Sequence, residues 1–186
     1  NESGVSTFFL QDKVDTGNII LQSRVPIIGE MNAGELHDAL SDIGSKAVLE
    51  TVQLIESGNA DAKQQDNTVA SPAPKIFKET CRINWNQPME TVHNFIRGLS
   101  PYPAAWTVHN EKVIKIFKSK KMESELQFSG ISNTDAGIIT TDEKKLFVKT
   151  ADGLLEILEL QQEGKKRMSA EEFLRGYRFM KQEKFC

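Results

Sequence analysis

The sequence lacks the features of membrane-spanning and disulfide-rich proteins. No run of about 18 apolar residues is present, so no segment could cross a bilayer as a helix. The first residues show no basic region followed by an apolar stretch, as a signal peptide would. Cys81 and Cys186 are the two cysteines, too few for a disulfide framework or a cysteine metal cluster. We therefore expect a cytoplasmic protein without a membrane partner.

Several enzyme signatures are also missing. The chain has no Walker loop, no nucleophile elbow and no glycine-rich dinucleotide fingerprint. His37, His93 and His109 have no metal-ligating partner at i, i+4 spacing, so we expect no metal site and place all three on solvated surfaces. The chain begins at Asn1 rather than at Met, and we expect it to be a fragment of a longer protein.

The net charge of −3 is unevenly distributed. Residues 1–79 hold 6 Lys and Arg against 12 Asp and Glu, a balance of −6, whereas residues 80–186 hold 17 against 14, a balance of +3. The basic second half is suited to an anionic partner, although two ordinary solvated surfaces explain the same numbers. Residues 59–75 have almost no large apolar side chains and predict a linker between two domains.

The first region predicts two strands and a helix. Residues 5–10 and 19–25 are rich in β-branched and aromatic residues and are bounded by turn-formers. Asn32 and Glu35 have the spacing of a capping box, and apolar residues then recur at helical spacing. We expect Gly44 and Ser45 to divide this stretch into two helices, and Gly58 to end it.

The second region predicts a helix, five short strands and a last helix. Asn86 or Gln87 is expected to cap the first helix, with Pro88 in its first turn. Ser169 and Glu172 form a second capping box. Strands with turn signals between them favour a small β-barrel, so the overall class is α+β. The predicted strands are residues 105–109, 113–118, 137–141, 146–150 and 154–160.

Asp15 is the leading candidate for chemistry. It opens an Asp-Thr-Gly triplet between the first two predicted strands. Three interpretations stay open from the residues alone. In the first, Asp15 is a turn residue whose side chain hydrogen-bonds the backbone of its own turn. It is one half of an aspartic-protease pair, which would need a homodimer to bring two carboxylates together. Or it is a single acid–base group whose partners lie outside this chain.

Basic residues are the second candidate set. One group follows a predicted strand and its exit, with Trp106, Phe117 and Phe128 interleaved, and another precedes the last helix. A barrel with a basic face binds nucleic acids through phosphate contacts, but a solvated strand face explains the pattern equally well. The residues are Lys112, Lys115, Lys118, Lys120, Lys121, Lys165, Lys166 and Arg167.

Six segments together resemble one protein family. In order and spacing they are similar to the C-terminal portion of the bacterial methionyl-tRNA formyltransferases, and the resemblance covers nearly the whole chain. The Asp-Thr-Gly element is shared by folate-dependent formyltransferases in general, whereas the runs at 96–106 and 164–169 are more specific to the tRNA-directed branch. The segments are ESGVS (2–6), VDTGNII (14–20), APKI (73–76), INW (83–85), IRGLSPYPAAW (96–106) and GKKRMS (164–169).

The resemblance implies a fold and a domain organisation. Residues 1–58 would form the C-terminal edge of a Rossmann-like α/β formyltransferase domain, residues 59–75 a linker, and residues 76–186 an OB-like β-barrel that binds tRNA. The reaction would move a formyl group from 10-formyltetrahydrofolate to the α-amino group of methionine on initiator tRNA, without a metal.

The same resemblance assigns roles to residues. Asp15 would be catalytic, and Asp15, Thr16 and Gly17 would lie beside the folate. Lys75 and Lys78 would join the basic residues above along the tRNA. The family pairs its aspartate with an Asn and a His upstream, so we expect this chain alone to be inactive. We also expect it to expose apolar surface in its first third or to bury that surface in a dimer.

Two other functions stay open. One is the hydrolase part of a formyltetrahydrofolate dehydrogenase, which has a similar second domain but transfers the formyl group to water. The other is an OB-type nucleic-acid-binding module without catalysis, which would not need the unit around Asp15.

Overall fold

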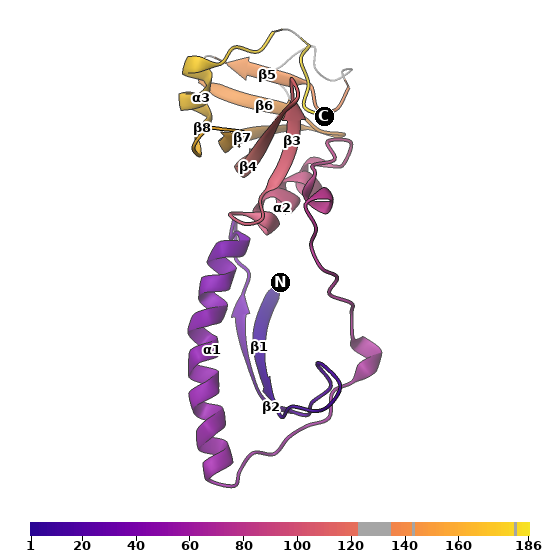
Figure 1. Cartoon of the computed structure of the whole chain (residues 1–186), viewed down its shortest axis with the longest axis vertical. Coiled ribbons are helices and arrows are strands. Elements are labelled where there is room, and N and C mark those ends of the chain that lie inside the picture. Colours follow the sequence, from indigo (N-terminus) through magenta and orange to yellow (C-terminus); the bar gives the residue numbers. More distant parts are fainter. Residues whose placement is uncertain (123–134, 143, 181) are drawn as a thin grey trace. The chain divides into compact units, whose positions relative to one another are not determined.

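The computed structural model describes residues 1–122, 135–142, 144–180 and 182–186. The chain divides into two compact units, Asn1–Lys75 and Ile76–Cys186, and each is described by itself (Figure 1). Phe128 lies outside the described residues. Among the helices of the described part, none combines the length and apolar character needed to cross a membrane.

The first unit is a β-hairpin with a long helix on one face. Strands β1 (Glu2–Phe8) and β2 (Ile19–Pro26) pair antiparallel, which confirms the two predicted strands. Helix α1 (Ala33–Glu56) packs against both strands (Figure 1). The hydroxyl oxygens of Thr7 on β1 and Thr51 on α1 lie 2.7 Å apart and share a hydrogen bond. A short 3-10 turn, η1 (Asn67–Val69), follows later in the unit.

Helix α1 begins as predicted but is not interrupted. Asn32 and Glu35 form a complete capping box, and Gly58 follows the helix with a φ of +71°. The predicted break at Gly44 and Ser45 is wrong, because the helix continues through both and Ser45 Oγ donates to the carbonyl of Asp42 within it. A glycine costs a helix about 1 kcal/mol. Packing of the helix on the hairpin offsets that cost.

The second unit is built on a six-stranded sheet. The strand order is β3-β4-β7-β6-β5, with β8 paired to β7, and every pairing is antiparallel. The five predicted strands are confirmed with shifted ends, whereas the two-residue strand β8 was not predicted. The strands are β3 (Ala105–His109), β4 (Lys112–Lys121), β5 (Ile139–Asp142), β6 (Lys145–Lys149), β7 (Leu154–Gln162) and β8 (Met168–Ser169).

Residues 183–186 connect the two end strands of this sheet. Val108 of β3 exchanges two backbone hydrogen bonds with Cys186, each 3.0 Å long. On the other side, the amide of Ile139 on β5 donates to the carbonyl of Glu183, and the amide of Phe185 donates to the carbonyl of Gly137. Among the described strands, ladder pairing alone does not close the sheet into a barrel. The C-terminal segment spans the gap between its ends.

Three helical elements lie in the described residues of the second unit. They are η2 (Glu79–Cys81), α2 (Met89–Leu99) and α3 (Ala170–Gly176), and α3 starts with the predicted capping box of Ser169 and Glu172. The predicted cap of α2 is wrong. Pro88 holds the N-cap position and makes no side-chain cap, and the backbone amide of Met89 donates to Asp152 Oδ1 at 2.6 Å. A residue 63 positions away thus satisfies a helix N–H that water would otherwise bind.

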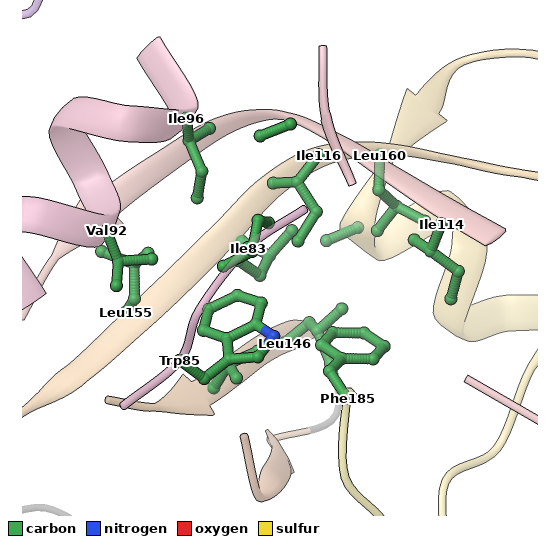
Figure 2. Close-up of a cluster of buried hydrophobic side chains, with 14 of the residues drawn as sticks. Ile83, Trp85, Val92, Ile96, Ile114, Ile116, Leu146, Leu155, Leu160 and Phe185 are labelled. Carbon is green, nitrogen blue, oxygen red and sulfur yellow. The ribbon is translucent and has the colours of Figure 1, made fainter. Parts of the chain in front are cut away.

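The core of the second unit lies between the sheet, α2 and the segment that precedes α2. Ile83 and Trp85 from that segment meet Ile96 of α2 and Ile114 and Ile116 of β4, and all of these side chains are buried (Figure 2). The rings of Trp85 and Phe185 stack with centroids 5.9 Å apart. The C-terminal segment is therefore anchored by a core side chain as well as by backbone hydrogen bonds.

Candidate functional site: the Asp15 turn and the basic sheet

Asp15 lies in the loop between β1 and β2, in a backbone conformation that side chains rarely adopt. Its φ is +59° and its side chain is exposed. Left-handed backbone costs a non-glycine residue roughly 1–2 kcal/mol, so surrounding contacts must hold the turn. Thr16 Oγ1 donates to the carbonyl of Lys13 at 2.8 Å. Gly17 is buried, and a Cβ there would lie 1.9 Å from the carbonyl oxygen of Phe9, so only glycine fits.

Gln65 holds the turn from outside. Its Nε2 donates to the carbonyl of Asp15 at 3.1 Å and to the carbonyl of Gly17 at 2.7 Å. Two residues earlier, Lys63 exchanges two backbone hydrogen bonds of 2.8 Å with Ile19 at the start of β2. The segment after α1 therefore returns to the hairpin and fixes the backbone on which Asp15 sits. No motif in the sequence marked Gln65 for this role.

The carboxylate of Asp15 faces solvent. Within residues 1–122 and the other described ranges, no hydrogen bond or ion pair reaches it. A carboxylate on a rigid turn can accept a proton or orient a cationic group, but general acid–base catalysis needs a second group within hydrogen-bonding reach. An acid–base role for this carboxylate would therefore require a second group that the described residues do not place beside it.

The basic residues of β4 divide between two faces. A bulge shifts the register with β7 around Lys118, so Ser119 points into the core beside His93 while Lys118 and Lys120 are exposed. Lys121 turns toward α2, where its Nζ donates to Glu90 Oε2 at 2.6 Å. Hydrogen bonds from Lys121 and Asn94 hold the pKa of the Glu90 carboxyl below its usual value. Lys121 is thus already part of an ion pair.

Lys112 and Lys115 lie nearer the start of β4. Lys112 is exposed, and Lys115 is half-buried and pairs with Trp106 of β3 on one side and Gln161 of β7 on the other. The indole of Trp106 donates to the carbonyl of Lys78 at 2.7 Å. This side of the sheet therefore gathers Lys115, Trp106 and the backbone of Lys78.

The turn between β7 and β8 carries the last basic group. Lys165 and Lys166 are exposed there. Arg167 is engaged within the sheet, because its guanidinium is bonded to Glu159 and lies 4.4 Å from the ring centroid of Phe117. Lys75 and Lys78, at the boundary of the two units, have exposed side chains.

The histidines correct an expectation. His37 is exposed, but His93 and His109 are each 3% exposed and are core residues. His109 Nδ1 lies 2.8 Å from the hydroxyl of Tyr177, and its Nε2 lies 3.5 Å from Glu183. Strand alternation places His109 on the buried face of β3. The expectation of a solvated surface had rested on its position at the end of the strand. In the described part of the chain, no group of three His, Cys, Asp or Glu is arranged to hold a metal ion.

Family models match both units. The model described as "Formyl transferase" matches residues 1–52, and the model described as "Formyl transferase, C-terminal domain" matches residues 75–178. Together they include the Asp15 turn and all six strands of the sheet in the second unit.

Curated relatives and solved structures agree with these matches. The chain is 49% identical over 177 residues to the methionyl-tRNA formyltransferase of Chlorobium luteolum, covering 95% of this chain and 55% of the relative. It is 47% identical over 188 residues to that of Bacteroides thetaiotaomicron, covering 95% and 56%. The chain thus spans about half the length of these relatives. The structure of HypX from Aquifex aeolicus in complex with tetrahydrofolic acid matches with a TM-score of 0.68 at 16% identity, over 93% of this chain and 30% of that one, and shares the fold.

Proposed function

Because the chain belongs to the formyltransferase family, we propose that it is the C-terminal part of a methionyl-tRNA formyltransferase. The observation that carries this proposal is the 49% identity over 177 residues to an enzyme of that name. The reaction would use 10-formyltetrahydrofolate as the donor and the α-amino group of methionine on initiator tRNA as the acceptor. A new bond forms between that nitrogen and the formyl carbon, and the bond from the formyl carbon to the folate nitrogen breaks.

Asp15 is proposed to handle charge and protons in this reaction. The attacking amine loses one proton and the folate nitrogen gains one, so a positioned carboxylate can hold or orient the group that carries the proton. The exposed carboxylate on a turn fixed by Gln65 fits such a role. Thr16 and Gly17 are proposed to lie beside the folate. They contribute by shaping the turn, since the Thr16 hydroxyl is hydrogen-bonded within it and Gly17 is buried.

Asp15 alone is not a complete catalytic site. A tetrahedral intermediate carries an oxyanion that needs hydrogen-bond donors, and no donor approaches the Asp15 carboxylate within the described ranges. The family's Asn and His would supply those donors. We therefore expect residues 1–186 alone to transfer no formyl group.

Each unit is proposed to be part of a larger architecture. We propose that residues 1–58 are the C-terminal edge of a Rossmann-like formyltransferase domain, residues 59–75 a linker and residues 76–186 an OB-like domain. The division after Lys75 and the bridging of β3 and β5 by residues 183–186 support this organisation. Exposed apolar side chains on α1 also support it, because an edge of a sheet domain normally packs on its neighbours. They are Val48, Leu49, Val52 and Ile55.

Those side chains have a second consequence. In isolation the chain is expected either to leave them exposed or to cover them by forming a dimer, which stays a prediction of the sequence. Sedimentation of purified residues 1–186 at several concentrations tests it. A monomer that binds no apolar dye would contradict both the dimer and the exposed surface.

The second unit is proposed to bind tRNA. Six lysines are exposed or half-buried along β4 and the turn before β8, where their charges can meet phosphates. Lys121 and Arg167 are proposed as weaker contacts, because Glu90 and Glu159 already neutralise them. Lys75 and Lys78 complete the proposed set. The six lysines are Lys112, Lys115, Lys118, Lys120, Lys165 and Lys166.

A two-part assay of residues 1–186 tests the proposal. Initiator methionyl-tRNA should bind, with an affinity that falls steeply as salt is raised from about 50 to 200 mM. Formyl transfer from 10-formyltetrahydrofolate should be absent. Failure to bind tRNA at low salt would overturn the proposed partner. Formyl transfer by residues 1–186 would overturn the proposal that the family's Asn and His must supply the hydrogen-bond donors. Release of formate without tRNA binding would favour the hydrolase alternative.

A further inference from the structure

Two adjoining hollows lie beside the extended segment that precedes α2 in the second unit, and both are lined by residues 82–84. The larger, of about 380 Å³, has Trp85 and Phe185 among its lining residues. The smaller, of about 180 Å³, lies between the same segment and α2 and includes Phe95. Among the described residues that line the two hollows, none is Asp or Glu.

The larger hollow has two cationic residues in its lining. Arg82 and Lys184 line it and both are exposed. The guanidinium of Arg82 lies 5.6 Å from the ring centroid of Trp106, a cation–π distance, and the hydrogen bond from the Trp106 indole to the carbonyl of Lys78 fixes that ring. The carboxylate of Glu183 is directed toward His109 instead. With two cationic side chains and no described Asp or Glu side chain in its lining, the larger hollow suits an anion.

The smaller hollow suits a flat heterocycle. Phe95 and Val92 supply apolar surface, and Thr91 is exposed on the same helix. The side-chain amide of Gln87 and the NH2 group of Asn84 lie at its wall for the polar edge of a ring, while Asn84 Oδ1 accepts from the backbone amide of Asn86. An aromatic side chain beside an apolar wall is the usual platform for an unstacked base, worth about 1–3 kcal/mol per base.

We propose that the two hollows together bind one unpaired nucleotide of an RNA, with its base beside Phe95 and its phosphate between Arg82 and Lys184. The inference rests on the proposed function, because it identifies a contact with the tRNA substrate. A base within a duplex is stacked and paired on both sides and cannot enter, so the site selects a single-stranded position. None of the basic residues named from the sequence lines either hollow.

Charge removal tests the phosphate contact. The Arg82→Ala/Lys184→Ala variant should bind initiator tRNA about 10-fold more weakly, and the slope of log affinity against log salt should fall by about 1. Lys46→Ala/Arg178→Ala is the matched control, since it removes one Lys and one Arg that are also exposed. The indole N–H signals of the two tryptophans report whether each variant keeps the fold.

Filling the smaller hollow tests the base contact. Thr91→Phe should weaken binding of hexauridylate by about 5- to 150-fold, which is the stacking range converted to affinity, and should leave the salt slope unchanged. An eight-base-pair RNA duplex should bind this variant and the unmodified chain equally. Gly98→Phe is the control on the same helix, because a Cβ there meets no atom within 4 Å.

The outcomes separate this site from the proposed function. If the unmodified chain fails to bind initiator tRNA, the proposed function and this site fall together. If it binds, but the charge-removal variant and Thr91→Phe match their controls, the nucleotide site is wrong and tRNA is held elsewhere. A loss on charge removal with no effect of Thr91→Phe would also overturn it, because a phosphate alone would then be bound.

Discussion

Gln65 should control the turn that carries Asp15. Its side chain makes two hydrogen bonds to that turn, to the carbonyls of Asp15 and Gly17. Each typically contributes about 0.5–1.5 kcal/mol net, so together they stabilise the turn by about 1–3 kcal/mol. The left-handed backbone of Asp15 costs roughly 1–2 kcal/mol. The two terms are of similar size, so removal of Gln65 should shift the balance toward open conformations.

Amide hydrogen exchange measures this shift directly. In Gln65→Ala, the amides of Phe9 and Lys63 should lose protection by about 5- to 150-fold, because they bond to Asn18 and Ile19 beside the turn. Amides of the second unit, such as that of Ile114, should not change. Gln65→Glu should lose at least as much at neutral pH, since a carboxylate oxygen would face two carbonyl oxygens.

The neighbouring amide provides the control. Gln64 is exposed and makes no side-chain hydrogen bond with the described residues, so Gln64→Ala should exchange like the unmodified chain. Equal exchange rates in Gln65→Ala and Gln64→Ala would refute the reasoning. A loss of protection throughout the chain in Gln65→Ala would also refute it, because the effect would then be global unfolding and not release of one turn.

Three further perturbations probe the second unit. Asp152→Ala should lower the free energy of unfolding of the second unit in urea by about 1–2 kcal/mol, because the hydrogen bond that caps α2 is lost. Asp152→Asn should keep most of that stability, and equal losses in the two variants would contradict the cap. Gly137→Ala should cost more than the roughly 1–2 kcal/mol of its φ of +90°, because its Cβ would lie 2.5 Å from the Phe185 carbonyl; unchanged stability would contradict that clash. The hydrogen bond from Lys121 lowers the pKa of Glu90. The ion pair should therefore stabilise the fold above the usual pKa of 4.5, and this contribution should be lost as pH falls through the lowered pKa. Lys121→Met should make stability depend less on pH in this range, and a pH profile of stability identical to that of the unmodified chain would contradict the pair.

Local signals predicted the elements well. Both capping boxes, the two N-terminal strands and the five strands of the second unit follow from short patterns of propensity and turn chemistry. The errors arose where residues distant in the sequence determine whether a helix continues or how it is capped. Gly44 stays helical because α1 packs on the hairpin, and α2 is capped by Asp152 from the turn between β6 and β7.

The candidate site shows the same division. The Asp15 turn could be recognised from its triplet, but Gln65 could not, because it lies 50 positions away in a stretch whose composition predicts a linker. The sequence also did not predict the bulge near Lys118, which turns Ser119 inward, or the hydrogen bond from Lys121 to Glu90. Strand register and long-range hydrogen bonds depend on residues that are distant in the sequence, so short sequence patterns do not predict them.

The position of residues 183–186 has a consequence for synthesis. During translation, β3 and β5 emerge from the ribosome well before the segment that joins their free edges. Until that segment is out of the exit tunnel, both edges present unpaired backbone groups of the kind that recruit other strands. Nascent chains stalled a few residues short of this point should therefore be preferred clients of chaperones, and released chains should not.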